Sequence, residues 1–178
     1  MNLAEYEEGK AQEIIDLFER VFSDSEGKDE GAVIKGLVRD LISITATADL
    51  LGYTASERDH IIGSIFFSRL TFEKGPTSFI LSPVAVDTHH QGQGIGQQLI
   101  RYGIEQLIDQ GVEWVFTYGD PQFYTKLGFK SISEADIRAP LKLSQPEGWL
   151  AQSLNSDRLV PISGESYCVE ALNNQDYW

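Results

Sequence analysis

The sequence lacks the features of a disulfide-bonded protein and of a membrane-spanning one. It has one cysteine, Cys168, so no disulfide can form within the chain, and a reduced cytoplasmic compartment is the simplest location. No apolar run approaches the roughly 20 residues that a membrane-spanning helix needs. The first eight residues, MNLAEYEE, are acidic and do not resemble a secretory signal. We therefore expect a cytoplasmic protein with no membrane partner.

Basic residues are also scarce. The chain has 14 Lys and Arg against 27 Asp and Glu, which gives a formal net charge of -13. Binding to nucleic acid requires clustered Lys and Arg that displace counterions from the phosphates, and no such cluster occurs. An acidic surface can attract cationic amines, but its ordinary role is to keep a protein soluble. We expect no nucleic-acid partner.

What is present fits one domain that spans residues 1–178. That length can bury its own core, and the composition, 42% hydrophobic and 23% charged, is ordinary for a globular protein. Helical periodicity is clear in residues 14–22 and 32–41, and the polar stretch 23–31 between them is interpreted as a loop. No repeat or linker divides the chain.

Strand patterns begin near residue 50. Segments rich in β-branched and aromatic residues predict strands at 50–55, 61–72, 78–86 and 112–118. The turns between the first three are short, which favours antiparallel pairing. Helical spacing predicts a helix over 95–110, and Asp120-Pro121 starts a short one. The last third is expected to hold a strand at 137–143, a helix at 147–154 and a strand at 167–172.

A glycine turn at the junction of strand and helix, Gln91-Gly92-Gln93-Gly94-Ile95-Gly96, carries the chemical information. Glycines at such a junction allow successive main-chain amides to point into one concavity. The N-terminus of the following helix adds unpaired N–H groups and the positive end of its dipole. Together they make a site suited to a pyrophosphate, although three glycines are often only a tight turn.

Two other phosphate-binding motifs fit this turn poorly. A Walker loop needs Gly-Lys followed by Ser or Thr, but Gly96 is followed by Gln97-Gln98. A dinucleotide-binding fingerprint has a third glycine at the position of Gln97 and follows the first strand of a βαβ unit. Here the turn follows an expected antiparallel meander. Both motifs are therefore disfavoured.

The turn and its surroundings resemble the GNAT superfamily, the GCN5-related N-acetyltransferases. Gln91-x-x-Gly94-x-Gly96 is similar to that family's Gln/Arg-x-x-Gly-x-Gly/Ala signature. Residues 81–87 resemble its fourth strand, and residues 119–129 resemble its later Tyr-x-x-x-Gly-Phe segment. The Gly-Asp-Pro variant of that segment, with tail residues 139–141 and 164–167, resembles a bacterial subfamily of predicted acetyltransferases.

The resemblance covers residues 50–129 and implies a fold. It implies an α/β (α+β) domain whose central sheet is mixed, mostly antiparallel, splayed between strands 4 and 5, and flanked by helices. The core would lie at about residues 50–130, followed by a C-terminal extension over 131–178. The expected activity is transfer of an acetyl group from acetyl-coenzyme A (acetyl-CoA) to a primary amine of a small molecule or peptide, without a metal.

The resemblance also implies which residues bind the coenzyme. The pantetheine arm would lie beside the fourth strand like an extra strand, and Pro83 suits an unpaired or bulged edge. The family often has Arg or Lys where Gln93 stands, so one charge contact is missing. Lys126 is either a phosphate contact or an exposed helix lysine. The expected coenzyme-binding residues are Val84, Ala85, Val86, Gln91, Gly92, Gln93, Gly94, Ile95, Gly96 and Lys126.

Tyr124 matches the family's catalytic tyrosine, whose phenol acts as general acid toward the departing thiolate. The alternative is a core tyrosine packed against Phe123 and Phe129. The amide of Val84 is expected to polarise the thioester carbonyl. No general base is evident: Ser78 to Val86 contains no carboxylate. The polar candidates near the site, each more simply a solvated loop residue, are Glu73, Asp87, His89, His90 and Asp120.

Other functions remain open. One alternative is a module that binds acyl-CoA without turnover, because no base is evident. Another is an acyltransferase that uses a longer acyl donor or an acyl-carrier protein. The acceptor amine is unidentified, and a homodimer is compatible with the sequence.

Overall fold

The computed structural model describes residues 1–156 and 158–178, and the chain divides into two compact units. Unit 1 consists of Met1–Phe67 and Pro83–Gly103, and unit 2 of Ser68–Ser82 and Ile104–Trp178. Three elements contribute residues to both units: β3 (His60–Phe72), β4 (Ser78–Val86) and α3 (Ile95–Asp109).

Unit 1 contains an antiparallel edge that the sequence did not reveal. Strand β1 (Asn2–Glu5) pairs antiparallel with β2 (Leu50–Glu57), with Leu3 opposite Ala55. The strand order continues through β3 to β4. β1 is only four residues long, too short for alternation to be distinguished from a polar terminus. The strands predicted at 50–55, 61–72 and 78–86 are confirmed.

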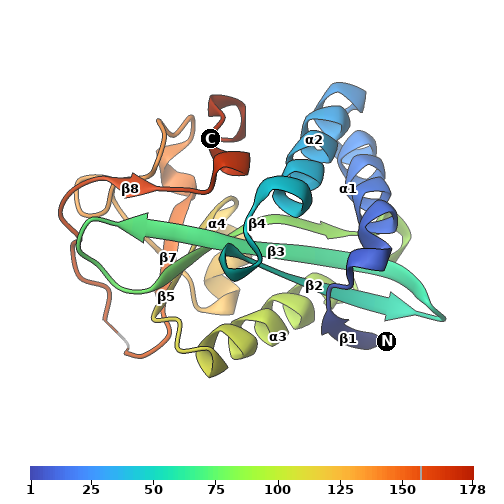
Figure 1. Ribbon diagram of the computed structural model, residues 1–178, viewed down its shortest axis with the longest axis horizontal. Coiled ribbons are helices and arrows are strands. Elements are labelled where there is room, and N and C mark those ends of the chain that lie inside the picture. Colours follow the sequence, from blue (N-terminus) through green and yellow to red (C-terminus); the bar gives the residue numbers. More distant parts are fainter. Residues whose placement is uncertain (157) are drawn as a thin grey trace. The chain divides into compact units, whose positions relative to one another are not determined.

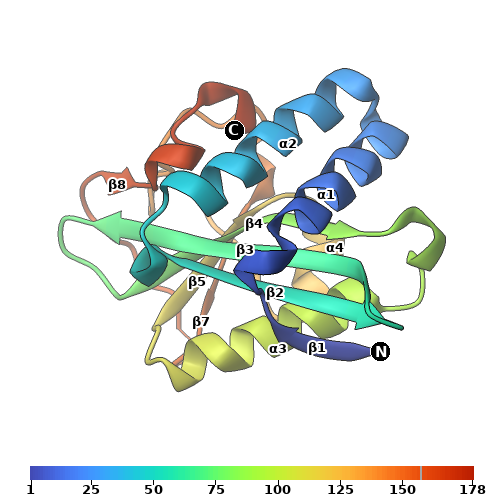
Figure 2. The same ribbon diagram turned by 45° about the vertical axis from the view of Figure 1, so that its right-hand side comes forward.

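Helices α1 (Ala11–Glu26) and α2 (Lys28–Ile44) lie side by side in unit 1 (Figure 1 and Figure 2). The predicted loop at 23–31 is wrong, because the polar stretch forms the end of one helix and the start of the next. Only Gly27, at φ +103°, separates them. Gly31 lets the helices approach closely: a Cβ there would lie 2.7 Å from the Glu19 carbonyl oxygen.

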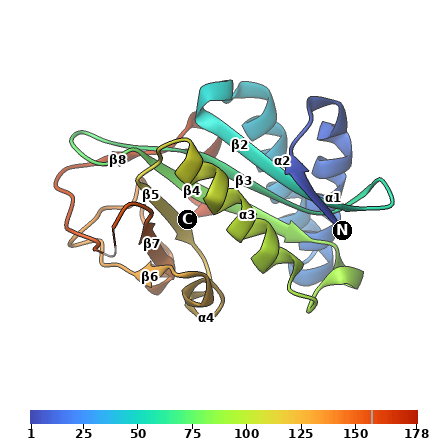
Figure 3. The ribbon, with the colours of Figure 1, turned by 90° about the horizontal axis from the view of Figure 1, so that it is seen from below.

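The central strands of unit 1 are covered on both faces. On β3, Phe66 packs against Phe18 of α1, with ring centroids 6.1 Å apart. The neighbouring Phe67 faces α3, where a Cβ at Gly103 would lie 2.5 Å from its ring. Because successive strand residues point to opposite faces, α1 and α3 lie on opposite sides of β3. Figure 3 shows α3 and the strands of unit 1 from below.

Unit 2 contains the parallel pair of the sheet. β4 pairs parallel with β5 (Trp114–Tyr118), and β5 pairs antiparallel with β7 (Trp149–Ser153). β6 (Lys130–Ser131) pairs with β7, and β8 (Ser166–Tyr167) pairs with β3. The eight strands thus form a mixed, mostly antiparallel sheet flanked by helices, which confirms the expected fold class.

The last third differs from expectation. The helix predicted at 147–154 is wrong: a 3-10 turn, Pro146–Gly148, leads into strand β7. Short apolar runs fit a buried strand as well as a helix, and Trp149 is fully buried with its ring stacked on Phe116 at 5.2 Å. The strand expected at 137–143 reduces to one bridge, Ile137 to Ile162. The one expected at 167–172 is β8 followed by a 3-10 turn.

The remaining elements are short. Helix α4 covers Pro121–Tyr124. The 3-10 helices are Glu8–Lys10, Thr47–Asp49, Thr88–His90, Thr125–Leu127, Pro146–Gly148, Glu170–Leu172 and Gln175–Tyr177. Across the described residues, no helix combines the length and apolarity that crossing a membrane requires.

Candidate active site

The glycine turn has the main-chain geometry that its sequence predicts. Gly92 and Gly94 have φ angles of +74° and +77°, a region that L-residues with a Cβ rarely adopt. α3 begins directly after them at Ile95, and the amide of Gln98 donates to the Gly94 carbonyl at 3.0 Å. The amides before Gln98 belong to the first turn, where no helix carbonyl is available to accept them. Residues 91–94 are exposed.

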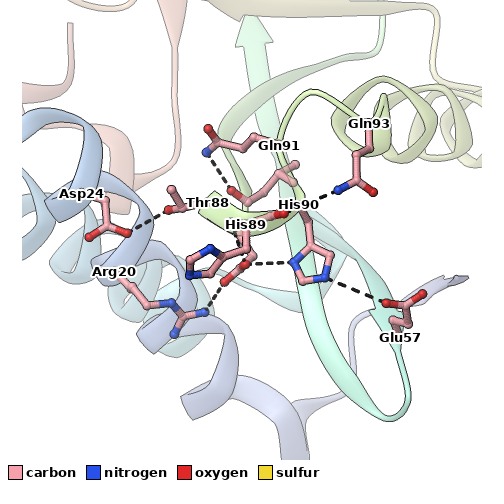
Figure 4. Close-up of polar contacts among 10 residues, drawn as sticks. Arg20, Asp24, Glu57, Thr88, His89, His90, Gln91 and Gln93 are labelled. Carbon is pink, nitrogen blue, oxygen red and sulfur yellow. Dashed lines mark hydrogen bonds and ion pairs between the residues drawn. The ribbon is translucent and has the colours of Figure 1, made fainter.

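The glutamine side chains of the turn bind the protein itself. The Nε2 of Gln91 donates to the Val86 carbonyl at 3.0 Å, which ties the turn to the end of β4. The Nε2 of Gln93 is 3.5 Å from the His89 carbonyl, a long hydrogen bond. Both contacts are visible in Figure 4. The turn therefore offers main-chain groups to a ligand.

Asp87, which follows β4, anchors the segment that precedes the turn. Its main-chain amide donates to the Ile62 carbonyl at 2.8 Å. One carboxylate oxygen accepts from His90 Nδ1 at 2.9 Å and from the His89 amide at 3.1 Å. The other accepts from Arg20 of α1 at 3.0 Å. Arg20, His89 and His90 are labelled in Figure 4, where dashed lines mark these contacts.

These contacts argue against Asp87 as the base. The hydrogen bond from His90, followed by those from Arg20 and the His89 amide, lowers the pKa of the Asp87 carboxyl despite the opposing effect of burial. A carboxylate that is already engaged on both oxygens and has a lowered pKa is a poor proton acceptor. The structure instead gives Asp87 a positioning role for the turn.

A groove of about 550 Å³ lies on the α1 side of Asp87. Its lining is Glu13, Asp16, Arg20, His60, Ile61, Ile62, Asp87 and His90. Glu13 is engaged there, since its carboxylate accepts from the Ile61 amide at 2.9 Å, which lowers its pKa. Thr88, also near α1, donates to Asp24 at 2.8 Å. α1 is thus fastened to the segment that carries the turn.

Strand β4 extends beyond its pairing with β5. The parallel register runs from Ser78 opposite Trp114 to Leu81 opposite Thr117, and β4 continues from Ser82 to Val86. In this last part, Pro83 and Ala85 are buried, whereas Val84 and Val86 are partly exposed. Pro83 has no N–H to donate to a ladder. The register therefore ends where the family resemblance implies that the two strands part.

Tyr124, at the end of α4, is held by aromatic neighbours in unit 2. Its ring makes edge contacts with Phe123 and Phe129, at centroid distances of 5.0 and 5.6 Å. Gly119 leaves room for the ring, because a Cβ there would lie 2.7 Å from Tyr124 Cε2. The residue as a whole is partly exposed. The contacts expected of a packed tyrosine are therefore present, on a side chain that also reaches the surface.

The surroundings of Tyr124 affect the ionisation of its phenol. Burial raises the pKa of Tyr124, a hydrogen bond with Thr117 acts in the opposite direction, and the negative charge of Asp120 raises it further. Thr117, on β5, is fully buried, and its hydroxyl donates to the Leu81 carbonyl at 3.0 Å. The phenol is therefore neutral at physiological pH, as a general acid must be.

The remaining candidates lie in loops or short helical turns. Asp120 caps α4, as its sequence predicts, by accepting from the Gln122 amide at 2.8 Å. Lys126 is exposed on the 3-10 helix after Tyr124. Glu73 lies beside Gly164 of the tail, and His89 is exposed. None of these contacts singles out a general base.

Comparison with known proteins identifies the family. The family profile described as "Acetyltransferase (GNAT) domain" matches residues 49–131. YjhQ of Escherichia coli K12, described as an uncharacterized N-acetyltransferase, is 32% identical over 141 residues, which cover 75% of this chain and 77% of YjhQ. The chain belongs to the GNAT family of acetyltransferases.

Solved structures agree with the assignment. The GNAT family N-acetyltransferase YhbS of E. coli, solved in complex with CoA, has a TM-score of 0.80 and 26% identity, covering 97% of this chain and 92% of that one. A GNAT family acetyltransferase of Brucella melitensis, solved with acetyl-CoA, has a TM-score of 0.70 and 24% identity, with 97% of each chain covered. The second likeness bears on the fold alone.

Two residues of this GNAT protein were missed in the sequence. Arg20 lies on the exposed face of the helix predicted at 14–22, and only the fold brings its side chain to Asp87, 67 positions later. Thr117 is a β-branched residue in a strand, where it is expected for packing. One signal could have drawn attention to it: a hydroxyl inside the apolar run Trp114–Tyr118 needs a partner when buried.

Proposed function

We propose that this GNAT protein transfers the acetyl group of acetyl-CoA to a primary amine of a small molecule or peptide, with Tyr124 as general acid. The observation that carries the proposal is the glycine turn at the start of α3, with Gly92 and Gly94 at positive φ. It supplies main-chain donors and a helix N-terminus to an anion, which suits the coenzyme's pyrophosphate. The CoA bound to the YhbS structure supports the choice of ligand.

In this proposal the coenzyme contacts main chain along β4 and the turn. The partly exposed residues Val84 and Val86 would pair with the amides of the pantetheine arm, next to buried Ala85. The amides from Gln91 to Gly96 would bind the pyrophosphate, and Lys126 would contribute charge to a phosphate. The Val86 carbonyl already accepts from Gln91, so its second lone pair would serve the ligand.

The chemistry follows from these assignments. The neutral amine attacks the thioester carbon, a C–N bond forms, the C–S bond breaks, and the electron pair leaves with sulfur. The Val84 amide would stabilise the charge that develops on the carbonyl oxygen. The phenol proton of Tyr124 would pass to sulfur, and the amine proton would be lost to water or to a base not yet identified. The phenolate of Tyr124 would then be reprotonated from solvent.

Transfer with and without the phenol tests the proposal. Thiol release from acetyl-CoA would be measured with spermidine, free lysine and an alanine-initiated peptide as probe amines, for wild type and Tyr124→Phe. We expect one probe to be acetylated, and Tyr124→Phe to lower turnover about 100-fold or more, because general acids contribute at least that much. Acetyl-CoA binding should survive the substitution.

Two outcomes would count against the proposal. Wild-type turnover in the Phe variant would remove Tyr124 from the mechanism. Tight acetyl-CoA binding with no acylation of any probe would favour the alternative of an acyl-CoA-binding module without turnover. A preference for longer acyl donors over acetyl-CoA would instead redefine the donor while leaving the turn's role in place.

A further inference from the structure

Strand β5 loses one of its two neighbouring strands shortly before the chain reaches Tyr124. Its parallel register with β4 ends at Thr117, which is opposite Leu81. On its other edge, the pairing with β7 continues to Tyr118, which is opposite Trp149. Of the described strands, only β7 therefore pairs with the end of β5, and other contacts must fix the position of that end.

Gly119, the residue after β5, extends the pairing and supports the Tyr124 ring. Its amide donates to the Gly148 carbonyl at 2.9 Å. A Cβ on Gly119 would lie 2.7 Å from Tyr124 Cε2, so the ring packs closely against this glycine. On the β7 side, a Cβ on buried Gly148 would lie 3.0 Å from the Gly119 carbonyl oxygen. The position of the Tyr124 ring therefore depends on where the end of β5 lies.

Tyr118 is held on the opposite face of the sheet. Because successive strand residues point to opposite faces, its side chain points away from the face on which Gly119 meets Tyr124. There its ring stacks on that of Trp178, with centroids 6.1 Å apart and an angle of 18° between the planes. The indole N–H of Trp178 donates to the Leu172 carbonyl at 2.9 Å, which fixes the ring against which Tyr118 lies.

The Tyr118 side chain also contacts the loop that precedes β7. Its phenol oxygen accepts from the Gln145 amide at 2.7 Å and lies 3.0 Å from Ser144 Oγ. Its ring approaches the same loop at Gly148, where a Cβ would lie 3.1 Å from Tyr118 Cε2. Gly148 thus meets both the Tyr118 ring and the main chain of Gly119, so the packing of this ring determines where Gly119 lies.

We infer that Tyr118 and Trp178 are positioning residues for Tyr124. Trp178 stacks on Tyr118, Tyr118 fixes the end of β5, and Gly119 at that end supports the Tyr124 ring. This inference rests on the proposed role of Tyr124 as general acid. A displaced phenol would deliver its proton to sulfur more slowly, whereas the coenzyme would still bind through the glycine turn.

Matched tryptophan variants test the inference. Trp178→Leu removes the stack on Tyr118, and Trp114→Leu removes an equally buried ring from the start of β5, since both tryptophans are 5% exposed. Turnover is measured with the best of the three probe amines, and acetyl-CoA affinity by calorimetry. We expect kcat to fall about tenfold in Trp178→Leu alone, part of the roughly 100-fold cost of a displacement of about an ångström. Acetyl-CoA affinity should be unchanged, and Trp178→Phe, which keeps a ring for the stack, should recover most of kcat.

A double-variant measurement separates positioning from a general loss of structure. In Tyr124→Phe there is no phenol proton to deliver, so Trp178→Leu should not lower the residual turnover further. A merely structural role would lower turnover by the same factor in both backgrounds. Tyr118→Phe removes only the phenol contacts to the loop, and kcat should fall about threefold, a smaller part of the same cost. Tyr167→Phe, at an exposed tyrosine, is its control.

The outcomes distinguish the inference from the proposed function. The inference is overturned and the proposed function stands if Tyr124→Phe loses turnover but Trp178→Leu keeps wild-type kcat, matches Trp114→Leu, or acts equally with and without the Tyr124 phenol. If Tyr124→Phe keeps wild-type turnover, both are overturned. Should Trp178→Leu fold poorly, Tyr118→Phe decides, because the inference requires it to lower kcat in the wild-type background and not in Tyr124→Phe.

Discussion

The glycine turn at Gln91–Gly96 and the site around Tyr124 are built from different groups: main chain in the turn and side chains around Tyr124. In the turn, the groups offered to a ligand are main-chain amides, and Gly92 and Gly94 set their direction through positive φ angles. At the second site, the proposed functional group is the Tyr124 side chain, and the rings of Phe123 and Phe129 pack against it.

This difference determines how each region fails. A main-chain site is sensitive to any residue that changes φ, even where there is space for its side chain. A side-chain site is sensitive to volume and to the loss of single hydrogen bonds. Substitutions of glycine therefore damage the two regions for different reasons, and matched glycines elsewhere in the chain serve as controls.

The largest effect is expected from Gly119→Ala. The new Cβ would overlap the Tyr124 ring, since the contact would be only 2.7 Å. We expect kcat to fall about 100-fold, because displacing a catalytic group by about an ångström has that cost. Acetyl-CoA affinity, measured by calorimetry, should change little. Gly36→Ala on α2, where nothing lies within 4 Å, is the control. Unchanged kcat in Gly119→Ala would mean that the position of the Tyr124 ring is not critical for acetyl transfer.

A smaller effect is expected from Gly94→Ala. The turn has space for a methyl group, but φ of +77° disfavours alanine by about 1–2 kcal/mol. The variant turn would relax when free, and binding would have to restore it, so acetyl-CoA affinity should fall about tenfold. Gly111→Ala has the same strain, with φ of +75°, in the turn that follows α3. Equal acetyl-CoA affinity in Gly94→Ala and Gly111→Ala would contradict the proposal that main-chain amides of the glycine turn bind the coenzyme.

A still smaller effect is expected from Asp87→Asn, which weakens the anchor of the turn. The folded pKa of Asp87 is lowered, so its carboxylate contributes stability above the unfolded pKa, about 3.9, and loses it as pH falls through the folded value. The variant should lose about 1 kcal/mol of unfolding free energy at pH 7.

Urea denaturation at several pH values checks this prediction. The difference in unfolding free energy between wild type and Asp87→Asn should narrow as pH falls from about 4 through the lowered folded pKa, because Asp87 of the folded wild type is then protonated as well. Asp40→Asn is the control, since its ion pair with Arg39 is a surface contact on α2. A difference in unfolding free energy that stays constant with pH would show that the charge of Asp87 does not contribute to stability.

The smallest effect is expected from Gln93→Arg, which adds the charge that the family resemblance implies at this position. Gln93 is exposed and makes only a 3.5 Å hydrogen bond, so little is lost. An exposed charge near a phosphate is worth up to about 1 kcal/mol, so affinity should rise roughly threefold and the gain should fade at high salt. Gln110→Arg, directly after the far end of α3, should have no such effect.

The fold could be predicted where local pattern and family motif agreed. The alternating strands β2 to β4 and helix α3 were expected, as was the sheet class. The polar stretch 23–31 was misread, because one glycine at Gly27 is enough to divide two helices. The strand Trp149–Ser153 was misread as a helix, since short buried runs have no decisive period. The prediction of a single domain remains a prediction.

The two candidate sites were predictable to different degrees. Glycine spacing indicates a main-chain site directly, because glycine is the residue type that adopts positive φ most readily. Side-chain contacts are not so visible in a sequence: only the pairing of β5 with β4 brings the Thr117 hydroxyl to the Leu81 carbonyl. Arg20 reaches Asp87 only after α1 has packed. The roles of all these residues in coenzyme binding and transfer remain predictions.

The most direct test of the central claim is a calorimetric titration of the purified protein with acetyl-CoA, alongside Gly94→Ala and Gly111→Ala. The account predicts saturable binding at one site, with weaker binding in the Gly94 variant alone. No heat of binding at millimolar acetyl-CoA would contradict it, and would leave a GNAT fold whose glycine turn holds no coenzyme.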